Sequence, residues 1–329
     1  MVGKTGVAVR KMRKKSHIII LLFFLMSTTI RFSYAAHTKV DESAKKIYDE
    51  LSKIPQEKLK NIDKEKFSIY NTLKKMNYHK LNEYYKVVLP FGNGNPEPSE
   101  IFSRKEFVDN QKELNVKLKK EYDYIEFFMQ PLYYVGKYTM GDQFAISRKN
   151  LNQKIKSNEG DFKLITDLRS IQLDFKLFQR HIKKIDSGRK FKQDDFIVKK
   201  DNDTVYVILG NNYKKLYLLG DQFDLFFHGK KMKFHIVGFF EKGDYIPFDG
   251  KRYCLDNYIV MPFYDALYSP IDEEEKIYQS IYYSQKNAGY IRATQHKNVE
   301  QLQEDISKLN IEYQLFLQLS DIPTTFYKF

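Results

Sequence analysis

The sequence is poor in the residues that most often build metal centres and disulfide frameworks. Its 329 residues include one cysteine, Cys254, so no disulfide forms within the chain and no zinc site rests on several thiolates. The seven histidines never occur as H-x-x-x-H or H-x-H, and neither G-x-S-x-G nor a complete phosphate-binding loop is present. We therefore expect no metal, no cofactor and no enzymatic activity, and we expect Cys254 to be a small core residue.

The positive charge of the chain is concentrated at its N-terminus. Lys and Arg number 55 against 42 Asp and Glu, a net charge of +13, and residues 1–35 hold seven basic residues and no acidic one. The remaining 13 − 7 = +6 is spread over interleaved Lys and Glu, without the basic blocks spaced by aromatic residues that follow a phosphate backbone. Nucleic acid is therefore not an expected partner. Apolar residues make up 42% of the chain, too many for a disordered protein.

The N-terminal segment predicts export. Residues 1–17 are basic, residues 18–30 are apolar or hydroxylated, and Ser33-Tyr34-Ala35 is typical of a signal-peptidase site with cleavage after Ala35. The alternative is an uncleaved anchor over residues 18–36, which would place residues 37–329 outside the membrane by the positive-inside rule. We expect either a single-pass protein of the cell membrane, extracytoplasmic over 37–329, or a secreted one.

The pattern of helix-like and strand-like segments in the exported part predicts an α+β protein. Residues 1–36 form the signal peptide or anchor, 37–90 are predicted to contain a helical stalk, and 91–329 form the main domain. Strand-like runs are expected at 84–89, 204–209, 224–227, 232–240 and 258–261, with a strand pair at 124–134 interrupted at Pro131. Helices are expected at 103–124, beginning with Ser103 as N-cap, and at 298–308, followed by a strand at 311–317.

Two acidic clusters and two histidines are candidates for catalysis or metal binding. Asp194 and Asp195, with His235, are the residues that an exported hydrolase would use, although no nucleophile motif accompanies them. His228 and His235 flank an expected hairpin near Asp224, which is the weak case for a metal site. The simpler interpretation of the clusters at 194–195 and 272–275 is a helix N-terminus and a solvated loop.

Aromatic residues are dense between positions 122 and 134. They are either core residues of a sheet or an exposed surface for an apolar peptide or lipid. The residues concerned are Tyr122, Tyr124, Phe127, Phe128, Tyr133 and Tyr134.

Five segments between residues 185 and 262 occur in a recognisable order. They are IDSGRKF (185–191) with DDF (194–196), VILGNNY (207–213), LGD (219–221), FHIVGF (234–239) and LDNYIVMP (255–262). This order resembles the extracytoplasmic domain of MacB/FtsX-type ABC transporter permeases, best over residues 165–265. The residues that carry the resemblance are Gly188, Arg189, Phe191, Asp195, Phe196, Leu209, Gly210, Gly220, Asp221, Gly238 and Pro262.

The resemblance implies a non-catalytic domain of two subdomains, one α+β and one inserted and more variable. In the family this domain lies between the first two membrane helices and transmits force from a cytoplasmic ABC ATPase, or contacts a peptide or lipoprotein outside. The sequence lacks the three further membrane helices of the family, so the resemblance implies an ATPase and a membrane-spanning permease as partners. The alternative is a stand-alone binding module, secreted or anchored, for a peptide, lipid or cell-envelope partner.

Overall fold

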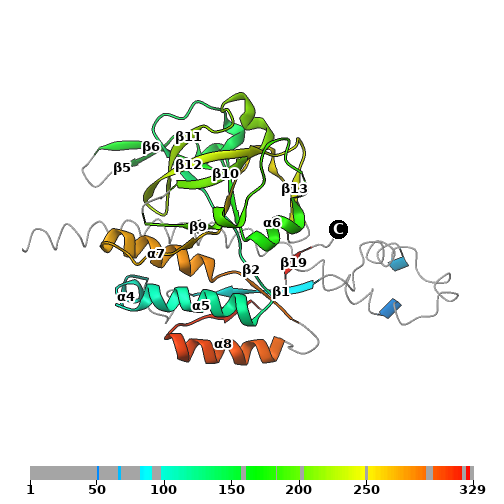
Figure 1. Ribbon diagram of the computed structural model, residues 1–329, viewed down its shortest axis with the longest axis vertical. Helices are drawn as coiled ribbons and strands as arrows, with labels where there is room; N and C mark the ends of the chain where they lie inside the picture. The colour runs from blue at the N-terminus through cyan, green and yellow to red at the C-terminus, as the bar shows by residue number, and fades with distance from the viewer. Residues whose placement is uncertain are drawn as a thin grey trace, which may run out of the picture.

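The fold is α+β, as the sequence predicts. A computed structural model describes residues 50–51, 66–67, 82–90, 98–156, 161–182, 184–200, 204–248, 251–293, 299–320 and 324–326. These residues form five helices, one small sheet, one large curled sheet and two two-stranded sheets (Figure 1). The helices are α4 (Pro98–Phe102), α5 (Phe107–Glu121), α6 (Phe175–His181), α7 (Glu273–Lys286) and α8 (Val299–Tyr313).

The small sheet takes its strands from both ends of the described chain. Its order is β18-β1-β17-β2, all neighbours are antiparallel, and β19 also pairs with β1. Strands β1 and β2 are joined through α5 and lie on either side of β17. Strands β17 and β18 are joined through α8 and lie on either side of β1. Each set is a split β-α-β unit, and the two units share strands β1 and β17. The strands are β1 (Asn82–Val88), β2 (Tyr124–Ile125), β17 (Tyr290–Arg292), β18 (Gln318–Leu319) and β19 (Thr324–Phe326).

The large sheet is built from residues between the two parts of the small sheet. Its order is β3-β7-β15-β10-β12-β11-β4-β6-β5, with β8 beside β12; β10–β12 and β7–β15 are parallel. The strands are β3 (Phe127–Met129), β4 (Leu132–Val135), β5 (Gln153–Lys156), β6 (Phe162–Leu168), β7 (Ser170–Leu173), β8 (Ser187–Gly188), β10 (Thr204–Leu209), β11 (Gln222–Phe227), β12 (Lys230–Phe239) and β15 (Ile259–Pro262). The two-stranded sheets pair β13 (Tyr245–Phe248) with β14 (Lys251–Cys254) and β9 (Ile197–Val198) with β16 (Asp265–Ala266).

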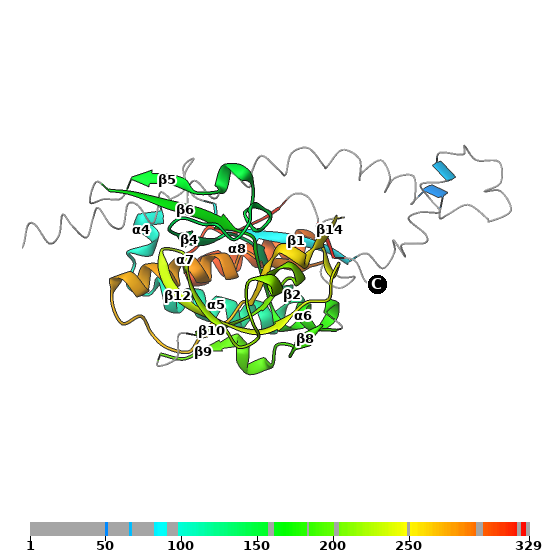
Figure 2. The ribbon, with the colours of Figure 1, turned by 90° about the horizontal axis from the view of Figure 1, so that it is seen from above.

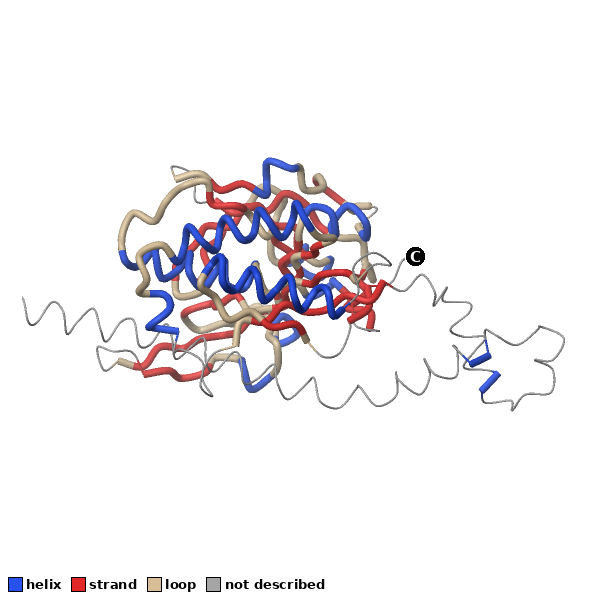
Figure 3. The backbone as a smooth tube through the Cα atoms, turned by 90° about the horizontal axis from the view of Figure 1, so that it is seen from below, coloured by secondary structure: helices blue, strands red, loops and turns tan. Residues whose placement is uncertain are grey.

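Helix α7 lies between the large sheet and the other long helices. In Figure 1 the large sheet is above α7, and α5 and α8 follow below it. Figure 2 shows from above the strands of the large sheet over these helices, and Figure 3 shows the helical layer from below. Residues 278–286 of α7 are all buried. A helix enclosed in this way has partners on all sides, so its polar residues must find hydrogen bonds inside the protein.

The apolar residues of α8 explain why this segment forms a helix and which face of it is buried. In α8 the buried residues Leu302, Ile306, Leu309 and Tyr313 recur at helical spacing and face one core cluster. Helix α7 instead begins with Asp272, whose side chain accepts a hydrogen bond from the Glu275 backbone N–H at 2.8 Å. Three glutamates in its first turn suit the positive end of the helix dipole.

Most expected strands of the main domain are present. The runs at 84–89, 204–209, 224–227, 232–240 and 258–261 correspond to β1, β10, β11, β12 and β15. The expected hairpin is β11–β12, with His228 and Gly229 as its two turn residues, both at positive φ (51° and 81°). Positive φ at both positions is the signature of a type I′ turn. Strands also occur on both sides of Pro131, although β3 and β4 are not neighbours in the sheet.

Three expectations about elements were wrong. Helix α5 begins at Phe107, with Glu106 as N-cap; the Ser103 hydroxyl donates to the Glu100 carbonyl oxygen at 2.9 Å. The segment 311–317 is not a strand, because α8 continues to Tyr313 and the next strand is β18. Cys254 is exposed at the end of β14 and is not a core residue, because this hairpin has an exposed face.

The N-terminal predictions lie outside the described residues. These are the signal or anchor over 1–36 and nearly all of the stalk, of which 50–51 and 66–67 are helical and 82–88 form β1. In the part that the structure describes, no helix is long and apolar enough to cross a membrane.

Candidate functional site

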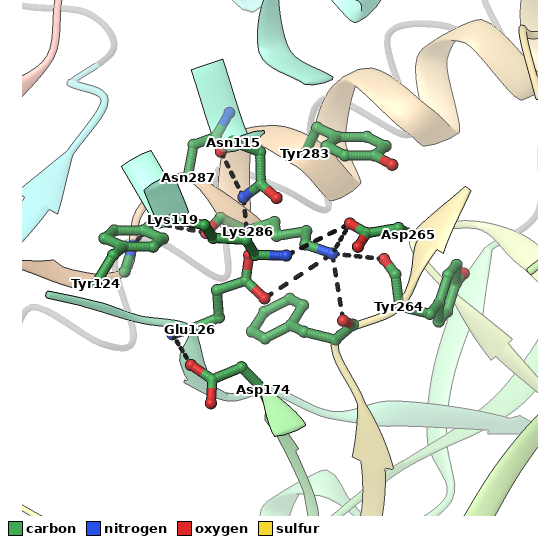
Figure 4. Close-up of polar contacts among 12 residues, drawn as sticks. Asn115, Lys119, Tyr124, Glu126, Asp174, Tyr264, Asp265, Tyr283, Lys286 and Asn287 are labelled. Carbon is green, nitrogen blue, oxygen red and sulfur yellow. Dashed lines mark hydrogen bonds and ion pairs between the residues drawn. The ribbon is translucent and has the colours of Figure 1, made fainter. Parts of the chain in front are cut away.

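The chain crosses between the small and large sheets at two points. On the way out, Glu126 alone separates β2 from β3. On the way back, the segment 263–265 follows β15 and leads towards α7. Figure 4 shows both crossings around one side chain, that of Lys286 at the end of α7. We call this group of residues the crossing cluster; it consists of Asn115, Lys119, Glu126, Asp174, the segment 263–265, Lys286 and Asn287.

Lys286 donates all of its side-chain hydrogen bonds to the segment 263–265, the returning crossing. Its ammonium group donates to the carbonyl oxygens of Phe263 at 3.2 Å and Tyr264 at 2.7 Å, and to Oδ1 of Asp265 at 2.5 Å. An ammonium group has three N–H bonds, so none is left over. The same nitrogen lies 3.8 Å from Oε2 of Glu126 on the outgoing crossing. The side chain of Lys286 is fully buried.

Glu126 is held mainly by residues of α5. Its Oε1 accepts from Nδ2 of Asn115 at 2.8 Å and lies 3.1 Å from Nζ of Lys119. Asn115 also donates to Oδ1 of Asn287 at 2.9 Å, which ties α5 to the residue after Lys286. Oε2 of Glu126 has no hydrogen-bond partner among the described residues. The nearby Lys286 charge therefore compensates this buried oxygen electrostatically.

The charges of the cluster shift one another's protonation. Burial lowers the pKa of Lys286. Burial also opposes the charged form of Lys119, but the charges of Glu126 and Asp265 outweigh it and raise the pKa of Lys119. Burial alone would raise the pKa of Asp265, and the two lysines hold it below its ordinary value. Opposite charges thus favour the ionised forms of Lys119 and Asp265.

Asp174 extends the cluster into α6. Its Oδ2 accepts the Glu126 backbone N–H at 2.8 Å, and its Oδ1 accepts the Leu177 backbone N–H at 2.6 Å as the N-cap of α6. Burial and the neighbouring Glu126 charge raise the pKa of Asp174 to about 6. The outgoing crossing is therefore attached to α5, α6 and α7 at once.

The polar groups of the crossing cluster bond mainly to one another. The ammonium of Lys286 has every N–H engaged, and no serine, cysteine or histidine belongs to the cluster. The carboxylates of the cluster are engaged as well: Glu126 accepts from Asn115, Asp174 from two backbone N–H groups, and Asp265 from Lys286. Among the described residues there is also no group of three or more His, Cys, Asp or Glu side chains that could hold a metal ion.

Four of the residues that carry the family resemblance lie on strands of the large sheet, and the others lie in the connections between strands; the four are Gly188, Leu209, Gly238 and Pro262. Gly188 on β8 pairs with Gly238 on β12, and β12 lies beside β10, which ends at Leu209. Gly188 has a φ of +85°, and a Cβ there would be 2.3 Å from the Val237 carbonyl oxygen. A Cβ on Gly210 would be 2.1 Å from the Leu255 carbonyl oxygen. Glycine is required at both positions because other backbone lies too close.

The polar residues of the same segments are bonded locally. Arg189 binds Asp195 through two hydrogen bonds, NH1 to Oδ2 at 2.5 Å and NH2 to Oδ1 at 2.9 Å. Asp195 also accepts the Lys192 backbone N–H at 2.7 Å, and Asp221 accepts the Leu218 backbone N–H at 2.7 Å. The remaining aromatic, glycine and proline positions close turns or fill the core; they are Phe191, Phe196, Gly220 and Pro262.

In the part of the chain that the structure describes, the side chains named for a hydrolase or a metal site lie apart and have other partners. The Asp195 carboxylate is occupied by Arg189 and a backbone N–H, so it is not a free base. His235 stands across from Gln222 on β11 and beside Tyr206 on β10, with ring centroids 5.5 Å apart. His228 is buried at the hairpin turn, 3.1 Å from the amide nitrogen of Gln130. Burial lowers the pKa of His228 to about 3.

The six aromatic residues at 122–134 do not form one exposed surface. Tyr124 and Phe127 are 4% and 2% exposed and belong to the core. The Tyr124 hydroxyl donates to the Lys286 carbonyl oxygen at 2.7 Å and accepts the Gly289 N–H at 2.8 Å. The other four are partly buried; they are Tyr122, Phe128, Tyr133 and Tyr134.

Sequence reasoning missed the crossing cluster. Its one usable signal is Glu126, a single acidic residue in the aromatic run 124–129, because a lone charge inside an apolar run must find a buried partner. Lys286 ends a segment in which isoleucine and tyrosine recur at helical spacing, at 277, 278, 281 and 282, but this helix was not among the expected elements. The chain matches no family model, no curated protein and no solved structure.

Proposed function

We propose that this chain is a non-catalytic extracytoplasmic domain of an ABC transporter permease system, in which it couples movement at the membrane to a large β subdomain. The small sheet with its helices is the membrane-linked subdomain, and residues 127–266 are the inserted subdomain that the family resemblance implies. The proposal places a cytoplasmic ABC ATPase and a membrane-spanning permease as partners, and a peptide or lipoprotein as the outer ligand.

The observation that carries the proposal is the pairing of β1 with β19. Asn82 lies opposite Phe326, Glu83 opposite Thr325 and Tyr84 opposite Thr324. The chain therefore enters and leaves this fold at one place, on adjacent antiparallel strands. A domain inserted between two membrane segments needs its two ends side by side, because both must reach the same membrane surface.

The crossing cluster supplies the coupling element of the proposal. Both connections between the subdomains contact Lys286, so a displacement of α7 moves both connections together. Helix α7 also contacts the tip of the β11–β12 hairpin through the ion pair of Lys230 and Glu275, at 2.7 Å. Interfaces of this kind are bistable and not continuously deformable, which suits the transmission of a discrete step.

The test begins with the full chain expressed in its own host, followed by fractionation, intact mass and crosslinking. The proposal predicts a membrane-bound product that retains residues 1–35 and crosslinks to an ABC ATPase or permease. It further predicts that Lys286→Met lowers the transport-linked ATPase rate of that complex, whereas Lys308→Met does not. Lys308 is a control because its side chain is 74% exposed and its ion pair is with Asp305, three residues earlier in the same helix.

A soluble product that begins at Ala36 would overturn the transporter role. The chain would then be the alternative that the sequence leaves open, a secreted binding module for a peptide, lipid or cell-envelope partner. An anchored product without any ATPase or permease neighbour would favour the anchored form of the same alternative.

A further inference from the structure

Of the strands that the structure describes, β5 is an edge strand of the large sheet. Among the described strands it pairs only with β6, and it is the last strand in the sheet order. In Figures 1 and 2 the β5–β6 ribbon projects at the end of the molecule away from β1 and β19. An edge strand presents unpaired backbone N–H and C=O groups, to which another extended chain can bond.

The register identifies which backbone groups face outward. Gly136 donates its N–H to the Leu164 carbonyl oxygen at 2.8 Å, so the hydrogen-bonding groups of Leu164 face β4. Because these groups alternate along an antiparallel strand, those of Lys163 and Ile165 face β5. Their partners Ile155 and Gln153 therefore bond to β6. The N–H and C=O groups of Lys154 and Lys156 point away from the sheet.

The side chains around this edge are cationic and apolar. Lys154 stands across from Leu164, and Lys156 stands across from Phe162, which is 69% exposed. The paired positions 153–156 and 162–165 hold three lysines and no acidic residue. A strand that joins this edge therefore places its side chains beside two ammonium groups and an exposed phenyl ring.

We propose that β5 is a docking site for an extended acidic segment of another protein, which adds to the large sheet as an antiparallel or parallel strand. Main-chain hydrogen bonds to Lys154 and Lys156 supply affinity, and alternating carboxylates opposite their side chains supply specificity. A second copy of this chain is a poor occupant, because two β5 edges would bring lysines against lysines. The inference goes beyond the proposed function and holds for a tethered or a secreted domain.

The experiment measures binding of a fluorescent peptide, Thr-Glu-Val-Glu-Val-Thr, to the full chain by anisotropy at low salt. The control peptide is Thr-Lys-Val-Lys-Val-Thr. We expect saturable binding of the acidic peptide at micromolar to millimolar concentration, loss of this binding at high salt, and no binding of the basic peptide. Amide resonances of residues 154 and 156 should shift on addition of the acidic peptide.

Two substitutions at one position separate backbone docking from charge attraction. Lys154→Ala removes a charge and keeps the outward N–H, so affinity should fall by about threefold to tenfold. Lys154→Pro also removes that N–H while the bonds of Ile155 to β6 remain, so binding should be lost. Lys215→Ala, at an exposed lysine in the 3-10 helix Asn211–Lys215 that follows β10, should change nothing. An unchanged thermal midpoint in each variant establishes that the fold persists.

Three results would overturn the proposal. One is the absence of binding at millimolar concentrations of the acidic peptide, which would mean that the lysines prevent another strand from pairing with β5. Another is equal binding to Lys154→Ala and Lys154→Pro, which would indicate charge attraction without strand addition. The third is a concentration-dependent dimer that Lys154→Pro abolishes, which would make a second copy the occupant.

Discussion

The ammonium group of Lys286 lies 3.8 Å from Oε2 of Glu126, the one residue between β2 and β3. One fully buried lysine thus contacts the outgoing crossing, while it donates three hydrogen bonds to the returning crossing. This arrangement concentrates the connection between the two sheets in a few groups. Urea or thermal unfolding of the purified protein measures how far these groups contribute to its stability.

Lys286→Met should lower the free energy of unfolding by about 3–5 kcal/mol, because the buried oxygens of the returning crossing lose their donor and Oε2 of Glu126 loses the nearest charge. Glu126 keeps the ion pair of its other oxygen with Lys119. Lys286→Met combined with Glu126→Gln should cost less than the sum of the single changes, since the Glu126 charge that Lys286 balanced is then removed. Lys308→Met should stay within about 0.5 kcal/mol of the wild type. Additive single and double costs would contradict the electrostatic coupling.

His228 should make the protein sensitive to acid. Its pKa is lowered to about 3 by burial, so the stability linked to its neutral form is complete above the unfolded value of 6.5 and is lost as pH falls towards 3. His228→Asn removes this titration, and asparagine followed by Gly229 suits the type I′ turn. Between pH 7 and pH 4 the variant should lose about 3 kcal/mol less stability than the wild type. Parallel stability curves for both proteins would refute this assignment.

Asp174 should make the protein less stable as the pH rises, the opposite of the effect of His228. Its pKa is raised to about 6 in the folded protein, so its protonated form is favoured by folding. The linked stability is present below the unfolded pKa of 3.8 and is lost as pH rises through 6. Asp174→Ser keeps an N-cap oxygen for α6 and removes the charge. The stability of the wild type relative to this variant should fall by at most about 3 kcal/mol between pH 4 and pH 7; a rise would exclude the assignment.

Two glycines of the family-like segments should differ in their tolerance of alanine. Both have positive φ, +85° at Gly188 and +90° at Gly220. A Cβ on Gly188 would meet the Val237 carbonyl oxygen at 2.3 Å, whereas a Cβ on Gly220 would meet nothing within 4 Å. We expect Gly188→Ala to cost about 3–5 kcal/mol and Gly220→Ala about 1–2 kcal/mol. Equal costs would mean that the backbone conformation alone matters.

The single thiol should be reactive in the folded protein. Cys254 is exposed at the end of β14. A maleimide reagent should add one label per chain without denaturant, at a rate close to that of the unfolded protein. Intact mass over time measures the label. Protection that disappears only on unfolding would place this thiol in the core, as the sequence had suggested.

The sequence alone determined the class of the fold and the position of many elements. The runs 204–209 and 232–240 are rich in β-branched and aromatic residues, which favour strands. Strands β10 and β12 were therefore predictable from local composition. Helix α8 followed from its apolar spacing. The single cysteine also excluded a disulfide framework within the chain.

Only the tertiary structure decided how these elements join. Helix α7 is buried on all sides over residues 278–286, so polar side chains such as Gln279 and Ser284 are buried together with the aromatic ones. An apolar pattern in the sequence does not show which polar residues will be enclosed in this way. The partners of Lys286 are 21 to 23 positions away along the chain, and Glu126 is 160 positions away (286 − 126). No local pattern encodes such contacts. The split β-α-β order that brings Asn82 beside Phe326 likewise depends on long-range strand pairing, which residue types at those positions do not specify.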